Sequence, residues 1–228
     1  MISLKNVSKI YDTFGKTFVA LDNVSLDIEQ GEFVAVLGES GSGKTTLLNL
    51  IAGLDKPSEG SITANELDIT AADDKMLSRF RNKTTGFIFQ SFHLEPLRTA
   101  VGNVMVPLLF ADYSRNKARQ MALESLRMVG LADKSYNRAS QLSAGQCQRV
   151  AVARAIVNKP SILLADEPTG NLDANTGRGI IRLINDINRS QGATVLLVTH
   201  DKEVAAEASR YIEIRSGVVV KDTGRKGV

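Results

Sequence analysis

The sequence predicts an α/β fold in which a mostly parallel sheet is covered by helices on both faces. Continuously apolar runs at 33–37, 161–165 and 194–198 are typical of strands that are buried on both sides. Amphipathic helical patterns separate these runs, and buried strands that alternate with helices indicate parallel pairing. Two earlier segments, 2–8 and 24–28, alternate apolar and polar residues, as half-buried strands do.

The middle of the chain departs from this alternation. A short strand is predicted at 86–90, and apolar residues at helical spacing then predict helix within 99–130. Ser143 is a good N-cap for a further helix that runs to Ile156. Because these helices follow one another without an intervening strand, we expect a helical insert over about 91–158 within the sheet domain.

The composition is that of an ordinary globular protein. The 228 residues, 43% hydrophobic and 23% charged, are enough to bury a large core, and we expect a single domain over 1–228. No apolar run approaches the roughly 18 to 20 residues that span a bilayer. A net charge of +3 is a weak electrostatic footprint, so nucleic acid is not an expected partner. The single Cys147 excludes an intramolecular disulfide, fits a reducing compartment and is predicted to be a packed small side chain.

The most informative motif joins the strand 33–37 to the helix that follows it. The motif reads Gly38-Glu39-Ser40-Gly41-Ser42-Gly43-Lys44-Thr45, and Thr46 continues into the helix. Glycines let the backbone curl so that several N–H groups point at one anion, and the helix N-terminus adds positive charge. Lys44 can reach the β- and γ-phosphates of a nucleotide, and the Thr45 hydroxyl can bind Mg²⁺. The competing interpretation is an ordinary glycine turn between a strand and a helix.

Two acids close the predicted strand 161–165. Open α/β sheets bind ligands at the carboxyl ends of their parallel strands, where Asp166 and Glu167 stand. Asp166 can hold Mg²⁺ opposite Thr45, directly or through water. Glu167 can act as a general base on a water molecule near the γ-phosphate. Taken alone, the pair could equally be two acids that end a strand in solvent.

A second anion site is indicated at the start of the helix near Ser143. The segment Leu142-Ser143-Ala144-Gly145-Gln146 follows a loop and supplies a hydroxyl, a glycine and a helix N-terminus. It has no lysine, and one domain needs only one cradle for a γ-phosphate. The pattern therefore suggests a site completed by another molecule, although an ordinary N-cap would look the same.

Taken together, these motifs resemble the ATP-binding subunit of an ABC (ATP-binding cassette) transporter over about residues 2–221. The matching positions stand in the order of the family: Tyr11, 38–46, Gln90, 142–146, 162–167, 171–173 and His200. The resemblance implies a P-loop NTPase fold with a mostly parallel core sheet, an N-terminal antiparallel β subdomain and a helical insert. It also implies an ATPase whose cofactors are ATP and Mg²⁺.

The resemblance carries roles to individual residues. Tyr11 would stack on adenine, and Gln90 would contact Mg²⁺ or the attacking water. His200 would contact the γ-phosphate and help to position that water. Asp173 would lie across a subunit interface near the partner's P-loop. The signature residues would bind the nucleotide held by the other subunit, so that two ATP molecules lie in a head-to-tail homodimer; these residues are Ser143, Ala144, Gly145 and Gln146.

The chain departs from the family pattern at two positions. The usual signature has two adjacent glycines, whereas the first position here is Ala144. Whether the added methyl group crowds the γ-phosphate depends on the backbone φ of Ala144. Cys147 occupies a position that glutamine often holds. We expect ATPase activity to survive both changes.

Further segments are similar to one subgroup of the family, the ATPases of lipoprotein release, macrolide export and cell division. These segments are 168–173 and 54–60. The similarity implies an integral membrane permease-type partner and a location at the cytoplasmic face of the cell membrane. The surface expected to contact this partner lies in the insert at Phe92, His93, Leu94 and Leu97, although these residues could instead pack within the insert.

Three alternatives remain open. ATP-driven closure could regulate an extracytoplasmic enzyme or signalling complex without transport, and the subgroup similarity makes this the strongest rival. A soluble ABC ATPase acting on DNA or ribosomes would be expected to carry two cassettes, a coiled coil or a basic arm. A small-molecule kinase would need an acceptor pocket and a lid, and would not need a signature for a partner.

Overall fold

The computed structural model describes residues 1–13, 15–111 and 113–224. The remaining residues, which the single-domain prediction includes, lie outside this description. The first sheet is antiparallel and has the strand order β2-β1-β4-β5. Its strands are β1 (Ile2–Thr13), β2 (Lys16–Ile28), β4 (Glu59–Ala64) and β5 (Leu67–Asp68). The predicted N-terminal antiparallel subdomain is therefore present.

The second sheet has six strands in the order β10-β9-β3-β8-β7-β6. All neighbouring pairs are parallel except β10 with β9, which confirms the mostly parallel core. The strands are β3 (Phe33–Leu37), β6 (Thr85–Ile88), β7 (Ile162–Asp166), β8 (Thr194–Thr199), β9 (Arg210–Arg215) and β10 (Val218–Asp222).

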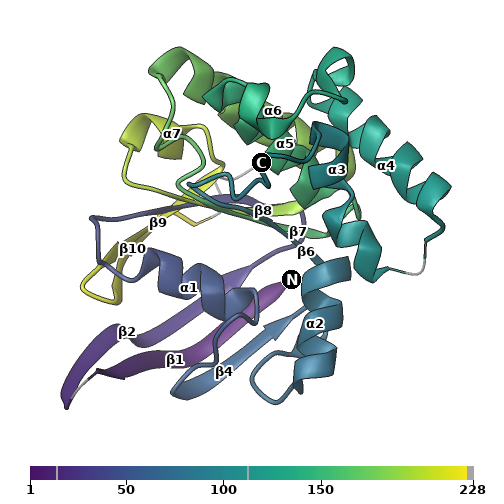
Figure 1. The fold of residues 1–228 in the computed structure, drawn as a ribbon. Helices are drawn as coiled ribbons and strands as arrows, with labels where there is room; N and C mark the ends of the chain where they lie inside the picture. Colours follow the sequence, from purple (N-terminus) through teal and green to yellow (C-terminus); the bar gives the residue numbers. More distant parts are fainter. Residues whose placement is uncertain (14, 112, 225–228) are drawn as a thin grey trace.

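The helices lie in two groups on either side of the parallel sheet (Figure 1). Helix α1 (Lys44–Ile51) lies between the two sheets, with α2 (Asp74–Lys83) beside it. The other face carries α3 (Ala100–Val104), α4 (Arg115–Met128), α5 (Ala144–Ile156), α6 (Ala174–Gln191) and α7 (Lys202–Ala206). Short 3₁₀ turns occur at Val106–Phe110, Ala132–Lys134 and Ala139–Gln141.

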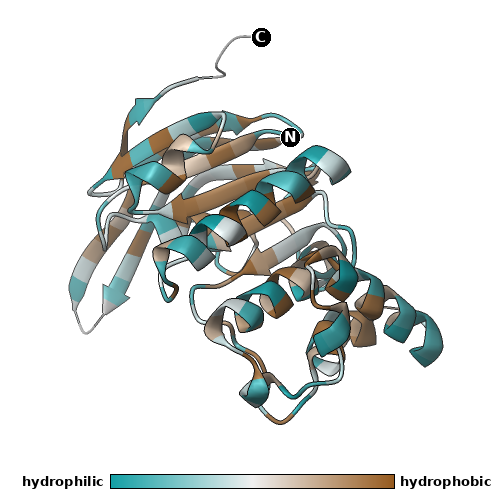
Figure 2. Cartoon of the chain, turned by 90° about the horizontal axis from the view of Figure 1, so that it is seen from above, coloured by the Kyte–Doolittle hydropathy of each residue, from teal (hydrophilic) through white to brown (hydrophobic). Residues whose placement is uncertain are grey.

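The buried strands divide the core into two layers. Successive side chains of a strand point to opposite faces of the sheet. In β7, Leu163 and Ala165 pack with the helices of the insert and α6, whereas Ile162 and Leu164 pack toward α1 and the antiparallel sheet. Figure 2 shows these apolar strands lying inside helices whose outward faces are hydrophilic. Because both faces are covered, the strands read as continuous apolar runs in the sequence.

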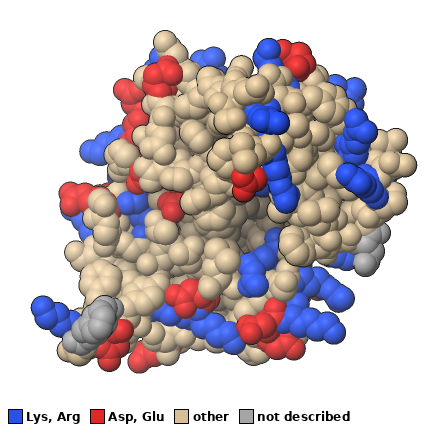
Figure 3. Space-filling view, in the orientation of Figure 1, with Lys and Arg blue, Asp and Glu red and all other residues tan. Residues whose placement is uncertain are grey.

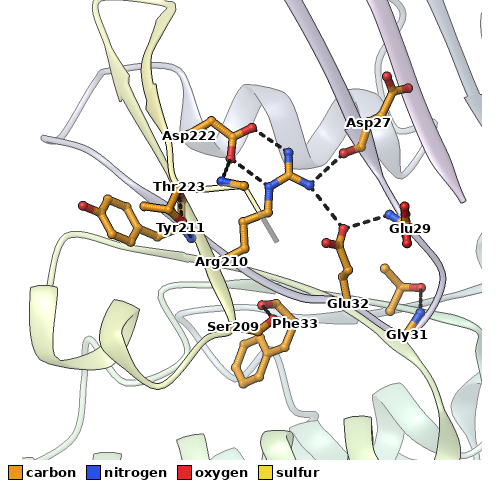
Figure 4. A network of polar contacts seen from close by, with 12 residues as sticks. Asp27, Glu29, Gly31, Glu32, Phe33, Ser209, Arg210, Tyr211, Asp222 and Thr223 are labelled. Carbon is orange, nitrogen blue, oxygen red and sulfur yellow. Dashed lines mark hydrogen bonds and ion pairs between the residues drawn. The ribbon is translucent and has the colours of Figure 1, made fainter. Parts of the chain in front are cut away.

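A partly buried arginine, Arg210, connects the two sheets (Figure 4). Arg210 in β9 makes a bidentate contact with Asp222 in β10, with distances of 2.8 Å and 2.6 Å from guanidinium nitrogens to carboxylate oxygens. The same guanidinium donates to Glu32 Oε2 at 3.2 Å. It also donates to the carbonyl of Asp27, which lies in β2. Because Glu32 directly precedes β3, the network anchors the amino end of the strand that leads to the glycine-rich loop.

Several elements differ from the sequence prediction. The strand predicted at 86–90 ends at Ile88, and Gln90 lies beyond it. The elements α2, α7, β4, β5, β9 and β10 were not predicted.

Acidic and basic side chains are interspersed around the rim of the face shown in Figure 3. Among the described residues, no helix has both the length and the apolar character needed to cross a membrane.

Candidate nucleotide-binding site

The glycine-rich loop leaves the N-terminus of α1 open. Gly43, the N-cap residue, has a φ of 106°, and the described structure shows no side-chain hydrogen bond that caps this helix. A Cβ at Gly43 would overlap the Ala20 carbonyl, so both the conformation and the space require glycine. Gly41 also has a positive φ, of 78°. The amide groups of the first helical turn are therefore available to an anion.

Lys44 lies inside this loop. Its side chain is buried, and Nζ donates to the carbonyl oxygens of Gly38 at 2.8 Å and Glu39 at 2.6 Å. Burial lowers the pKa of Lys44, while the nearby carboxylates of Glu167 and Asp166 act in the opposite direction. A lysine held by two carbonyl groups can exchange those contacts for phosphate oxygens.

Thr45 and Asp166 form the part of the site that suits a divalent cation. The Thr45 hydroxyl donates to Asp166 Oδ1 at 3.2 Å. Burial raises the pKa of Asp166, and the charge of Glu167 adds to the rise, whereas the Thr45 hydrogen bond and Lys44 oppose it. A hydroxyl and a carboxylate are oxygen ligands of the kind that Mg²⁺ prefers. In the described part of the chain, no group of three or more His, Cys, Asp or Glu side chains is placed to hold a metal ion.

Glu167 adopts an unusual backbone conformation at the end of β7. Its φ of 43° lies in the left-handed region, which for a residue other than glycine indicates stored strain of about 1–3 kcal/mol. The Glu167 N–H donates to the Val198 carbonyl in β8 at 3.0 Å, which holds this turn in place. His200 Nδ1 lies 3.2 Å from Glu167 Oε2, and the His200 side chain is exposed. The two side chains predicted to act on water are therefore in contact.

One pocket of about 570 Å³ collects nine of the predicted site residues, whereas Gly38 and Gly43 of the loop are not in its lining. Its lining consists of Glu39, Ser40, Gly41, Lys44, Thr45, Gln90, Asp166, Glu167 and His200. Ser42 is buried instead, and its amide already donates to the Glu39 carbonyl. Thr46, which follows Thr45 in the first turn of α1, and Tyr11, in β1, lie outside the lining of this pocket.

The loop that carries Gln90 is held by contacts that the sequence did not reveal. Asn171 Nδ2 donates to the Gln90 carbonyl at 3.0 Å. Gln148, fully buried in α5, donates to the Pro168 carbonyl at 2.7 Å, and Arg154 donates to the carbonyls of Phe92 and His93. The available signal was a polar residue on an apolar helix face, because Gln148 precedes the buried Val152 and Ile156 by four and eight residues.

The second predicted cradle, at the start of α5, is already capped. Ser143 Oγ accepts from the Gln146 amide at 3.3 Å, and Gln146 Oε1 accepts from the Ser143 amide at 3.0 Å. Ala144 has helical backbone and is exposed, so its methyl group introduces no backbone strain. A Cβ at Gly145 would overlap the Thr176 methyl group of α6, so a larger residue here would force the Thr176 side chain to shift.

This cradle shares a pocket of about 430 Å³ with the segment 171–173. Asp173 is the N-cap of α6 and accepts from the amides of Asn175 and Thr176. Hydrogen bonds from Thr176 lower the pKa of Asp173. Cys147 is half-buried beside the cradle, and burial raises the pKa of its thiol, which agrees with an inert packed side chain.

Comparison with known proteins places the chain in a class. The model of the ABC transporter family matches residues 21–170. The chain belongs to this family, as an ATP-binding cassette with ATPase chemistry, which confirms the class predicted from the motifs.

Among its relatives, the ABC transporter ATP-binding protein MJ0796 of Methanocaldococcus jannaschii is 46% identical over 100% of this chain and 98% of its own length. YvrO of Bacillus subtilis, an ABC transporter ATP-binding protein, is 43% identical over 97% of this chain and 96% of its own. A MacB macrolide export ATP-binding/permease protein of Hyphomonas neptunium is 43% identical over 99% of this chain, which spans 35% of that protein.

Solved structures agree with this placement. A dimeric post-hydrolysis structure of MJ0796 bound to ADP and Pi superposes with a TM-score of 0.91 at 44% identity, over 100% of both chains. CbiO1 of Clostridium perfringens, part of the transporter complex CbiONQ, gives a TM-score of 0.87 at 26% identity over 99% of this chain and 88% of that one. The predicted P-loop NTPase fold of the ABC type is therefore confirmed.

Proposed function

We propose that this chain binds Mg²⁺-ATP at the open end of α1 and hydrolyses it within a head-to-tail homodimer. The carrying observation is that Lys44, Thr45, Asp166, Glu167 and His200 line one pocket. The amides of the loop and Lys44 would hold the β- and γ-phosphates, and Thr45 and Asp166 would hold the cation together with Gln90. When bound, the cation neutralises charge on the phosphates. ATP would also lie against Tyr11 through its adenine base.

In this proposal Glu167 accepts a proton from the attacking water. His200 Nδ1, at 3.2 Å from the Glu167 carboxylate, orients that carboxylate and lies where it can also face the γ-phosphate. Gln90 lines the same pocket and would help to orient the water. General base catalysis of this kind contributes about 10²- to 10⁴-fold to the rate.

The dimer supplies what the signature pocket lacks. Ser143, Ala144, Gly145 and Gln146 form a helix N-terminus, and none of the described residues that line their pocket is a lysine. A γ-phosphate held by Lys44 of another copy would complete it, with Asp173 at the same interface. The dimeric form of MJ0796, which was solved with ADP and Pi, supports this arrangement.

The dimer would act on a permease-type membrane partner, which would hold the chain at the cytoplasmic face of the membrane. The MacB relatives, whose names join ATP-binding and permease functions, support this partner. The insert offers an exposed apolar surface at Leu97, Leu109 and Phe110, with 73%, 63% and 78% of each residue exposed. Leu94 instead packs against the core, so it serves the fold of the insert.

The test combines assembly with chemistry. With Mg²⁺ and ATP, the Glu167→Gln variant should elute as a dimer in size-exclusion chromatography, while its phosphate release falls about 10²- to 10⁴-fold. Glu66→Gln is a control for the change of residue type, because Glu66 also has a positive φ but lies exposed in the turn between β4 and β5, outside the lining of the pocket. A Glu167→Gln variant that stays monomeric with ATP, or that still releases phosphate at the normal rate, would refute the proposal.

A further inference from the structure

Tyr11 belongs to a cluster of three side chains in which every polar group has a partner. Its hydroxyl donates to Asp55 Oδ2 at 2.9 Å. Lys9 Nζ donates to Asp55 Oδ1 at 2.7 Å and to the Lys56 carbonyl at 2.7 Å. The same ammonium group lies 4.8 Å from the centroid of the Tyr11 ring, which is the geometry of a cation–π contact. The phenol is therefore held at its tip and covered on one side.

Asp55 reaches this cluster from the loop that follows α1. The amides of Leu54 and Asp55 donate to the Asn49 carbonyl, at 2.9 Å and 3.4 Å, so the loop folds back against its own helix. The N-terminus of α1 forms the phosphate cradle, and the loop after its C-terminus carries Asp55. One helix thus connects the phosphate cradle to the support of Tyr11. Asp55 also lies in the segment 54–60, which the sequence singled out without a function.

The charges within the cluster are well defined. Lys9 is mostly shielded, with 12% of its side chain exposed, while 31% of the Asp55 side chain is exposed. Burial alone would raise the pKa of Asp55, but hydrogen bonds from Lys9, Tyr11 and the Lys56 amide outweigh it and hold this pKa below its usual range. Burial and the Asp55 hydrogen bond raise the pKa of Tyr11. The phenol therefore keeps its proton and the carboxylate its charge at neutral pH.

We propose that Asp55 and Lys9 are positioning residues that fix the plane of the Tyr11 ring for stacking of a purine base on its uncovered face. Asp55 holds the hydroxyl and Lys9 covers the opposite face, so the ring is ordered before the nucleotide arrives. Pre-ordering a side chain removes a cost that binding would otherwise bear. The inference rests on the proposed role of Tyr11 as the adenine platform.

A purely structural role for the cluster makes a different prediction. If Asp55 only ties the loop after α1 to β1, its loss would disturb α1 and weaken the binding of any polyphosphate. If Asp55 positions the Tyr11 ring, its loss would weaken binding of ATP but not of inorganic tripolyphosphate, which has no base. The comparison of these two ligands separates the two roles.

The test measures dissociation constants for both ligands by isothermal titration calorimetry at fixed salt and Mg²⁺. We expect Asp55→Ala to weaken ATP binding by about 3- to 10-fold and to leave tripolyphosphate binding unchanged. Tyr11→Phe, which keeps the ring and loses the hydroxyl, should have a similar effect, and the double variant should be no weaker than either single one. Asp55→Asn, which keeps an acceptor for the hydroxyl, should recover part of the loss. Glu59→Ala is the matched control, because it removes an exposed carboxylate from β4.

Each result has a clear meaning. Equal weakening of both ligands by Asp55→Ala, or additive losses in the double variant, would overturn the positioning role. So would ATP binding that Asp55→Ala leaves unchanged while Tyr11→Ala weakens it. If Tyr11→Ala itself leaves ATP affinity unchanged, the adenine platform of the proposed function is what fails.

Discussion

The N-termini of α1 and α5 are both predicted anion sites, yet the chain prepares them differently. At α1, Gly43 leaves the first amides of the helix without a side-chain cap. At α5, Ser143 and Gln146 satisfy each other's amides through a reciprocal capping box. The first end is ready for a phosphate in a single chain. The second is stable without one, so a ligand there has to displace contacts that already exist.

The positively charged side chains near the N-termini of α1 and α5 also differ in how the chain itself holds them. Lys44 points into the loop at α1, where the carbonyl groups of Gly38 and Glu39 hold it. Arg149 lines the pocket at α5, but its Nη1 donates to the Val129 carbonyl at the end of α4 at 2.9 Å. The α1 end therefore carries a charge that can turn to a ligand, whereas in the proposed dimer the α5 end would meet a ligand held by the other copy.

The largest effect is expected from breaking the open end. Lys44→Ala removes a charged hydrogen-bond donor worth about 1.5–3 kcal/mol, so ATP binding should weaken about 10- to 100-fold. Calorimetric titration of the isolated chain measures this affinity. Lys83→Ala, in the last turn of α2, is the control for loss of one positive charge. An ATP affinity that Lys44→Ala leaves unchanged would contradict the assignment.

The next effect tests why the second end contains a glycine. Gly145→Ala should lower the free energy of unfolding by about 1–3 kcal/mol, because the new methyl group would overlap Thr176. Urea denaturation measures the change. Gly179→Ala, also at the contact between α5 and α6, meets only the Arg149 guanidinium at 3.6 Å and should not destabilise the protein. Equal stability of both variants would show that packing does not require Gly145.

Removing the cap of α5 separates stability from assembly. Ser143→Ala should lower the free energy of unfolding by about 1 kcal/mol, leave ATP binding by the single chain intact and weaken ATP-driven dimerisation. Ser114→Ala is a matched control, because Ser114 caps α4 through an amide contact of the same 3.3 Å length. If both variants dimerise equally with ATP, the α5 end does not bind the nucleotide held by the other copy.

The smallest effect concerns the contact between Arg210 and Asp222, which belongs to the network at the amino end of β3. Arg210 hydrogen bonds outweigh burial and lower the pKa of Asp222, so the folded state binds a proton less readily than the unfolded state. This contribution to stability is present above about pH 4 and is lost as the pH falls through the folded-state pKa. Asp222→Asn should flatten the acid limb of the stability curve by less than about 1 kcal/mol, since the carboxylate is partly exposed.

Thermal unfolding across pH measures this change, and ATP affinity at neutral pH should stay as in the parent chain. Asp186→Asn, on the exposed face of α6, should leave the shape of the curve unchanged. An acid limb that Asp222→Asn does not alter would show that the arginine network contributes nothing to the pH dependence of folding.

The central strands of the parallel sheet were predictable, because a strand that is buried on both faces appears in the sequence as a continuous apolar run. The predicted strand 33–37 coincides with β3, and the predicted helix that Ser143 caps is α5. The strands β9 and β10 escaped prediction because charged residues interrupt the apolar pattern of both. In β10, which is the edge strand, Val218 and Val220 are also exposed.

The site was predictable to the extent that it depends on local sequence. The loop 38–45 and the acids at the end of β7 are local motifs, and five loop residues and both acids line one pocket. The contacts of Gln148, Arg154 and Asn171 with backbone carbonyls could not be predicted, because each joins segments more than 19 residues apart. The role of Gly145 was also hidden, since it depends on how closely α6 approaches.

Helix α5 has a consequence for how a pair of these chains would work. The helix begins at the exposed Ser143 and Ala144, while Gln148 and Arg154 hold the loops after β7 and β6 in the same molecule. A displacement of α5 would therefore move the backbone of the loop after β6 and of the loop after β7 together. In the proposed dimer, the two nucleotide sites would therefore be coupled. Phosphate release should then rise more steeply than linearly with nucleotide concentration.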